Sequence, residues 1–232
     1  MKTWLKKLYK IIDSKHPDIG CLIYKLYYRQ AFNKTRRVIC GRNNVVRYYK
    51  STLTSVVFNI KGDRNTIEIA DGCRLHNVTF YIRGNDHQVL IGRDCCFNLG
   101  GTIWLEDSSC SLTIGKDSTF EEVLLTLTEP GSKIFIGQGC MFASDIDVRT
   151  GDSHAVISRA SGKRLNDAED VTIGNHVWIA AHSVLLKGSL VSDDSVVATG
   201  SVVTRKFGEK GIIIGGNPAV QLKEGITWTR ER

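Results

Sequence analysis

The C-terminal part of the chain carries an aliphatic residue at every sixth position. In the stretch "VTIGNHVWIAAHSVLLKGSLVSDDSVVATGSVV", which starts at Val171, these positions hold Ile173, Ile179, Leu185, Val191, Val197 and Val203. A helix would repeat its apolar residues about every 3.6 positions and a flat strand about every two. Hexapeptide periodicity is instead typical of a parallel β-helix, in which three short faces form each coil. The pattern therefore predicts an all-β solenoid.

The same period continues upstream with interruptions. Hexapeptides that begin with isoleucine start at Ile69, Ile91, Ile114, Ile136 and Ile173, which lie 22, 23, 22 and 37 residues apart. Because three hexapeptides make a coil of about 18 residues, we expect about four extra loop residues in each early coil. We predict that the β-helix spans residues 37–217 and is followed by a C-terminal tail, 218–232.

The fifth position of each hexapeptide is held by a small residue, as expected for a position that faces inward at a corner. These residues are Cys73, Cys95, Ser118, Cys140, Val177, Ser183, Ser189, Ser195 and Ser201. A buried cysteine behaves as a small hydrophobic residue. We therefore assign these cysteines to packing; the alternative is that they are metal ligands or nucleophiles.

The 37-residue interval holds about 15 residues more than its neighbours. They follow Val148 in the polar stretch "RTGDSHAVISRASGKRLNDAED", which cannot fit inside a coil. We predict that residues 149–170 form a protruding loop. Long loops on a rigid scaffold are common places for functional sites, and His154 lies near the start of this one.

Three interpretations of His154 compete. As a general base, its neutral imidazole would accept a proton from an attacking hydroxyl group, a role that suits a pKa near neutrality. It could also be a solvated surface residue, or a metal ligand together with His176 and His182. Those two residues occupy the fourth position of consecutive hexapeptides and so belong to different faces, which is poor geometry for one metal ion. We favour the general base and predict no metal site.

The motifs "DSHAVIS", "DVTIGNHVWIAAHSVLLKG" and "GGNPA" resemble the hexapeptide-repeat acyltransferases, a family with a left-handed β-helix. The similarity extends over roughly residues 40–223 and is strongest to maltose and galactoside O-acetyltransferases and to bacterial capsular-polysaccharide O-acetyltransferases. The left hand comes from the resemblance alone, because parallel crossovers are usually right-handed.

The resemblance implies that acetyl-CoA is the co-substrate, that the protein is a homotrimer, and that the donor lies between neighbouring chains. It implies that His154 is the catalytic base, and we predict that Asp152 contacts the sugar acceptor. The donor-binding residues would be Trp178, Ala181, Thr199, Thr204, Arg205 and Lys223. Trp178 would line the thioester, although it could instead be a buried interface aromatic. The chain departs from the family at Val220, where a basic residue usually follows "GNPA".

The net charge of +7 is unevenly distributed. Residues 1–50 hold 13 of the 31 Lys and Arg but only two acids, a balance of +11, which leaves −4 for residues 51–232. A basic terminus on a mildly acidic body does not indicate nucleic-acid binding.

Seven cysteines without CxxC pairs favour a reducing compartment. Since neither a signal peptide nor an apolar run of about 18 residues is evident, we expect a cytoplasmic protein.

The basic N-terminal segment, residues 1–36, is predicted to be helical. In "WLKKLYKII" the apolar residues gather on one helical side and the lysines mostly on the other. It could cap the open end of the β-helix, or residues 1–32 could contact anionic lipid at the membrane surface.

These observations predict an acetyl-CoA-dependent O-acetyltransferase that acts on a sugar hydroxyl of a surface polysaccharide or its precursor. Transfer would be direct between the two bound substrates. Two alternatives remain: N-acetylation of an amino sugar on the same scaffold, and a non-catalytic β-helix that assembles partners.

Overall fold

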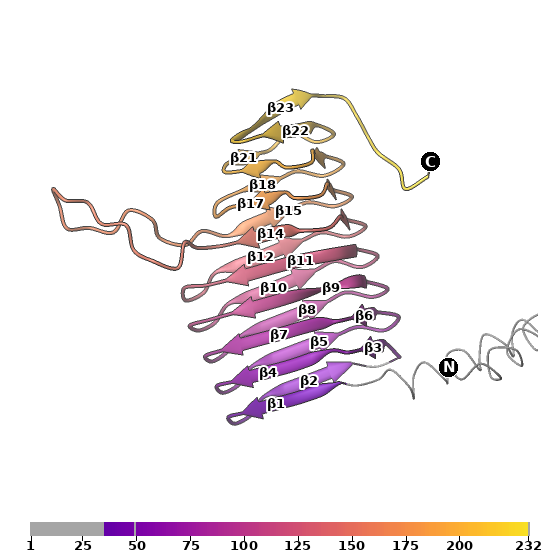
Figure 1. The fold of residues 1–232 in the computed structure, drawn as a ribbon, viewed down its shortest axis with the longest axis vertical. Coiled ribbons are helices and arrows are strands. Elements are labelled where there is room, and N and C mark those ends of the chain that lie inside the picture. Colours follow the sequence, from indigo (N-terminus) through magenta and orange to yellow (C-terminus); the bar gives the residue numbers. More distant parts are fainter. Residues whose placement is uncertain (1–34, 49, 232) are drawn as a thin grey trace, which may run out of the picture.

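The computed structural model describes residues 35–48 and 50–231. All regular secondary structure in this part of the chain is β, in 23 strands stacked as a three-sided solenoid (Figure 1). In the same part of the chain, no helix is long and apolar enough to cross a membrane. The predicted helical segment and its membrane contact lie outside the described residues, except that Arg36 already begins the first strand.

The chain visits three faces in turn, each a parallel ladder. Face 1 contains β2 (Val45–Tyr48), β5 (Thr66–Ile69), β8 (Gln88–Ile91), β10 (Ser111–Ile114), β12 (Lys133–Ile136), β15 (Val171–Ile173), β18 (Leu190–Val191) and β21 (Lys206–Phe207). Face 2 contains β3 (Thr52–Thr54), β6 (Arg74–His76), β13 (Met141–Phe142), β16 (Trp178–Ile179), β19 (Val196–Val197) and β22 (Ile213–Gly216).

Face 3 contains β1 (Arg36–Cys40), β4 (Val57–Lys61), β7 (Val78–Arg83), β14 (Ile146–Arg149), β17 (Val184–Leu185) and β20 (Val202–Val203). Two long strands, β9 (Cys96–Leu105) and β11 (Thr119–Leu127), bend from face 2 onto face 3 and pair with both. The last strand, β23 (Ala219–Lys223), turns back antiparallel to β22, so the predicted C-terminal tail begins with a strand.

The six-residue period corresponds to columns of buried side chains. On face 1 the first residues of successive hexapeptides pair directly, and all are at most 2% exposed: Ile69, Ile91, Ile114, Ile136, Ile173 and Val191. Burial of such branched side chains on every coil is the main favourable free energy available to a narrow solenoid. The predicted β-solenoid is therefore confirmed.

The expectation that the early coils carry their additional residues in loops is wrong. The additional residues lengthen the strands on face 3 instead, because β4 has five residues and β7 has six, whereas β17 and β20 have two each. A longer strand keeps its backbone groups in the ladder and its side chains alternating, so it adds core without unpaired amides. The solenoid consequently narrows toward β23 (Figure 1).

The small residues at the fifth positions are packed in the interior. Cys73, Cys95 and Cys140 are at most 1% exposed, and Ser118 donates a hydrogen bond to the carbonyl of Gly137 at 3.0 Å. Burial raises the pKa of the Cys140 thiol to about 11. Because the thiolate is the reactive form, this cysteine is suited to packing and not to nucleophilic chemistry.

Candidate functional site

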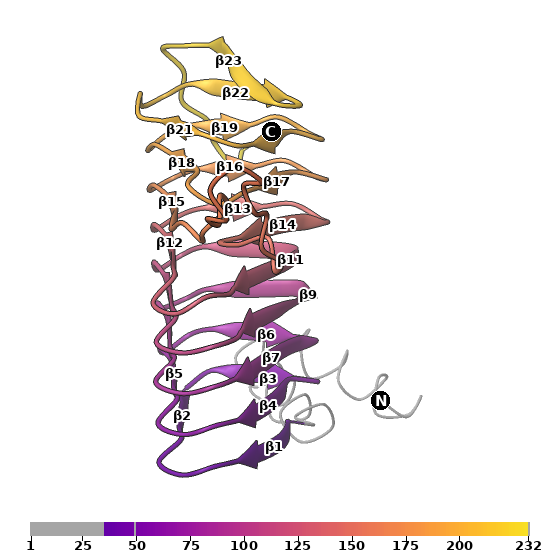
Figure 2. The same cartoon turned by 90° about the vertical axis from the view of Figure 1, so that its left-hand side faces the viewer.

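Residues 150–170, called the arm below, leave the solenoid at the corner between face 3 and face 1, after β14, and return into β15. A loop projects here as the sequence predicts, although Arg149, the first residue of the predicted loop, is the last residue of β14 (Figure 1; Figure 2 views the arm end-on). Its two sides form a narrow hairpin, in which Leu165 N–H donates to the Val156 carbonyl and Ser158 N–H to the Lys163 carbonyl, both at 2.8 Å. The arm is therefore a hydrogen-bonded hairpin that projects from the solenoid.

The base of the arm holds the backbone around His154 in a tight turn. The N–H of His154 donates to the carbonyl of Asp152 at 2.8 Å, with Ser153 between them at a φ of 65°. A three-residue turn with a positive central φ is rare and strained. Such strain gathers at functional sites, where the surrounding structure must hold it.

Asn166 is the residue that holds this turn. Its amide nitrogen donates to a carboxylate oxygen of Asp152 at 2.9 Å and to the carbonyl of His154 at 2.8 Å. Its amide oxygen accepts from the N–H of Val156 at 2.7 Å. The residue is 9% exposed. The sequence pattern does not single out this residue, although it is the single carboxamide in the polar stretch. Its three contacts need two N–H donors and one oxygen acceptor on the same side chain, which a carboxamide supplies.

Two ion pairs tie the arm to the coils on either side. Lys187, at the same corner in the next coil, contacts the Asp152 carboxylate at 2.8 Å. The hydrogen bond from Lys187, supported by that from Asn166, lowers the pKa of Asp152 below its ordinary value. On the preceding coil Glu129 pairs with Arg164 of the arm. Asp152, predicted to contact the acceptor, is thus engaged in holding the turn.

The imidazole of His154 is exposed, and neither of its ring nitrogens has a hydrogen-bond partner among residues 35–48 and 50–231. The other two histidines of the proposed metal site lie at the two remaining corners. His176 stands between faces 1 and 2 and pairs with Asp194 at 2.9 Å, and His182 stands between faces 2 and 3 and pairs with Asp145 at 2.9 Å. One chain therefore does not bring the three histidines together.

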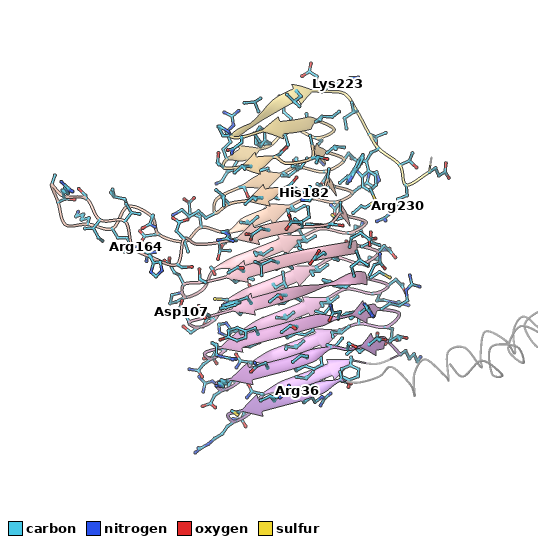
Figure 3. All side chains as sticks on the ribbon, in the orientation of Figure 1. Arg36, Asp107, Arg164, His182, Lys223 and Arg230 are labelled. Carbon is cyan, nitrogen blue, oxygen red and sulfur yellow. The ribbon has the colours of Figure 1, made fainter. Side chains whose placement is uncertain are left out.

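The predicted donor-binding residues divide into two groups. Trp178 lies on face 2, Ala181 and Thr199 lie at the corner of faces 2 and 3 in successive coils, and Lys223 ends β23. Thr204 and Arg205 lie on the opposite side, at the corner from which the arm projects. Figure 3 shows Arg164 on the arm at one side of the solenoid and Lys223 away from it. Only contact between chains would unite the two groups.

The C-terminal segment returns along face 2 and packs beside Trp178. Trp228 is 8% exposed, stacks on His176 with ring centroids 4.3 Å apart, and donates to the His176 carbonyl at 2.7 Å. Its ring centroid is 6.1 Å from that of Trp178. Arg230 continues the contact by donating to the Cys140 carbonyl at 3.0 Å. Trp178 is therefore half-buried by its own chain. The sequence pattern gave no sign that a second aromatic residue, Trp228, lies beside it.

Comparison with known proteins identifies the family. No family model matches the sequence. The chain is 33% identical over 192 residues to a polysialic acid O-acetyltransferase of Neisseria meningitidis, a match that covers 82% of this chain and 88% of that protein. The chain belongs to the hexapeptide-repeat O-acetyltransferases. A polysialic acid O-acetyltransferase of Escherichia coli O1:K1 is 31% identical over 117 residues, which cover 50% of this chain and 38% of that one.

Solved structures place this O-acetyltransferase in the same fold. The crystal structure of the polysialic acid O-acetyltransferase OatWY superposes with a TM-score of 0.77 at 29% identity and covers 85% of this chain and 92% of its own. That of the polysialic acid-specific acetyltransferase NeuO gives 0.72 at 25% identity, covering 87% and 91%. The predicted family and the predicted O-acetyltransferase activity are confirmed.

Proposed function

We propose that this enzyme transfers an acetyl group from acetyl-CoA to a hydroxyl group of an acidic bacterial surface polysaccharide, with His154 as general base. The observation that carries the proposal is the match to a polysialic acid O-acetyltransferase over 88% of that protein's length. The exposed imidazole on a projecting arm supports the assignment of the base, because a base must reach the hydroxyl within hydrogen-bond distance.

The reaction would proceed in one active site without a covalent enzyme intermediate. The imidazole of His154 accepts the hydroxyl proton while that oxygen attacks the thioester carbonyl, and backbone N–H groups stabilise the negative oxygen of the tetrahedral intermediate. As the intermediate collapses, the carbon–sulfur bond breaks and the imidazolium returns the proton to the departing sulfur. The products are an acetyl ester and free CoA thiol.

The site would be completed between chains. The arm leaves one edge of the solenoid, whereas Trp178 lies on face 2, which does not adjoin that edge. In a homotrimer, the arm of one chain could lie against face 2 of its neighbour and place His154 beside the partner's donor. Closed rotational symmetry is the common arrangement for such assemblies.

An acceptor panel tests this proposal against its alternatives. The enzyme is incubated with acetyl-CoA and polysialic acid, dextran or glucosamine, and both thiol release and product mass are followed. We expect an alkali-labile ester on polysialic acid only. A stable amide on glucosamine would favour N-acetylation. Absence of thiol release with every acceptor would support the non-catalytic assembly protein.

Removing Lys187 should weaken catalysis without unfolding the protein. In Lys187→Met the Asp152 carboxylate loses the cation that lowers its pKa, and the turn around His154 loosens. We expect the turnover number to fall about three- to tenfold with little change in Tm. Because the folded pKa is depressed, the pair stabilises the arm above the ordinary aspartate pKa of about 3.9 and loses this contribution as the pH falls through the folded value.

The matched control is Lys210→Met, which removes a lysine that pairs with Asp193 at 2.9 Å on another corner. It should leave turnover unchanged. Equal losses in both variants would show that the effect of Lys187 is not specific to the arm.

Arg205 and Lys223 are proposed to bind the phosphates of acetyl-CoA through charge-assisted hydrogen bonds. Arg205→Ala and Lys223→Ala should each raise the KM for acetyl-CoA about three- to tenfold, the equivalent of up to ~1.4 kcal/mol. The KM for the acceptor should not change. Lys116→Ala, an exposed lysine on a different corner, is the control. If neither substitution changes the KM for acetyl-CoA, the proposed donor site is wrong.

A further inference from the structure

Face 3 carries a column of outward side chains that leads to the arm. Strand pairing aligns one residue from each of six coils, in the order Val38, Asn59, Tyr81, Trp104, Thr126 and Arg149. Neighbouring strands lie about 4.8 Å apart, so the column is about 24 Å long. Arg149 is the last residue before the arm. In Figure 1, β1, β4 and β7 stack below the point from which the arm projects, and β14 lies at its level.

The centre of this column is a fixed aromatic pair. The ring centroids of Tyr81 and Trp104 are 4.3 Å apart, and the guanidinium carbon of Arg83 lies 3.7 Å from the Tyr81 centroid. Hydrogen bonds from Arg83 to the Asn59 carbonyl at 3.0 Å and to the Asn59 side chain at 3.2 Å hold the guanidinium in place. The tyrosine ring is thus enclosed between a cation and an indole.

The indole of Trp104 keeps an open side. Its neighbour toward the arm is Thr126, whose small side chain cannot cover an indole ring. Both aromatic residues remain half-buried and not fully buried. A rigid, partly exposed aromatic ring offers a large apolar surface with a polar edge, and the C–H face of a pyranose ring packs on such a surface.

The lower coils of face 3 are uniformly basic. The outward positions of β1, β4 and β7 hold Arg36, Lys61 and Arg83 and no acidic residue. Arg37 is in register with the buried Phe58 and lies over the Phe58 ring, so it does not belong to this outer surface. Arg36 and Lys61 are exposed. At the upper end, Asp147 is paired with Arg149. This face therefore complements an acidic polymer, while the body of the protein from residue 51 onward has a net charge of −4.

We infer that face 3 is an extended binding track for an acidic glycan chain. Carboxylates of the glycan contact Arg36, Lys61 and Arg83, one sugar ring packs on Trp104, and the chain continues past Arg149 to the arm that carries His154. This inference rests on the proposed function and specifies how its acceptor is held. Since several contacts on one polymer reinforce each other, long chains should bind more tightly than short ones.

The test is the affinity for polysialic acid, measured without acetyl-CoA by titration calorimetry on the full-length protein. Trp104→Ala should raise the Kd for long chains about tenfold, and Arg36→Gln combined with Lys61→Gln should do the same at low salt, where exposed charges are least screened. Trp104→Tyr should retain most of the affinity, because stacking is preserved. Matched controls on face 1 are Phe135→Ala, which removes an aromatic 45% exposed, and Lys133→Gln.

The outcomes separate this inference from the proposed function. If the wild-type protein binds polysialic acid but transfers no acetyl group, the proposed function is contradicted, whereas the inferred binding track on face 3 still stands. Transfer with the same Kd in all variants would overturn the track alone, as would equal losses in the controls on face 1. A change of oligomeric state in Trp104→Ala, seen by light scattering, would assign face 3 to chain association instead.

Discussion

Replacing His154 with alanine is expected to lower the turnover number about 10²–10⁴-fold, the usual contribution of a general base. The imidazole projects from the arm, outside the hydrophobic core, so its removal creates no cavity. Tm and the affinity for acetyl-CoA should therefore stay close to those of the wild type. Turnover is measured by thiol release from acetyl-CoA with polysialic acid as acceptor.

The control for this substitution is His76→Ala, which removes another exposed imidazole at the end of β6. It should leave turnover unchanged. If His154→Ala retained near-wild-type turnover, the imidazole would not be the base, and the arm would have only a positioning role.

Mixing two inactive variants should restore activity if the site is shared between chains. His154→Ala chains keep a native Trp178, and Trp178→Ala chains keep a native His154. In randomly mixed trimers from equal amounts, about one quarter of the interfaces would pair both native residues. We expect activity near that fraction of wild type, measured after the chains have exchanged under mild denaturant.

This experiment first needs Trp178→Ala to be inactive alone and chain exchange to be demonstrated with a mass-tagged subunit. A site contained in one chain would give no recovery, because no single chain then holds both residues. A monomeric mass in light scattering would also contradict the shared site.

The repeat made the fold predictable from the sequence. Each coil repeats the same inward positions, so the spacing of Ile114, Ile136 and Ile173 in the sequence predicts that these residues pair in one ladder. The narrowing of the solenoid toward β23 was not predictable from the sequence. An interval of 22 residues between hexapeptides is the same whether the additional residues form a loop or lengthen β7. The left-handed winding stays a prediction from the resemblance.

The site was only partly predictable, for a different reason. The arm interrupts the hexapeptide period and can therefore be recognised in the sequence, together with His154, which lies in it. Trp228 contacts His176 across 52 residues, and Asn166 reaches back 12 residues to the His154 carbonyl. Neither contact has a periodic signal, because each depends on where the chain returns in space. The same limit explains why Trp178 and Arg205 were grouped although they lie on opposite sides of the solenoid.

The most direct test follows the acetyl group itself. Acetyl-CoA labelled in its acetyl carbonyl carbon is incubated with polysialic acid and wild-type enzyme or His154→Ala, and the polymer is examined by NMR after removal of the nucleotide. We expect a labelled, alkali-labile ester on the polysialic acid with the wild type and almost none with the variant. Labelled ester formed at equal rates by both proteins would contradict the role of His154 as the general base. Thiol release by the wild type without label on any sugar would contradict acetyl transfer to the glycan.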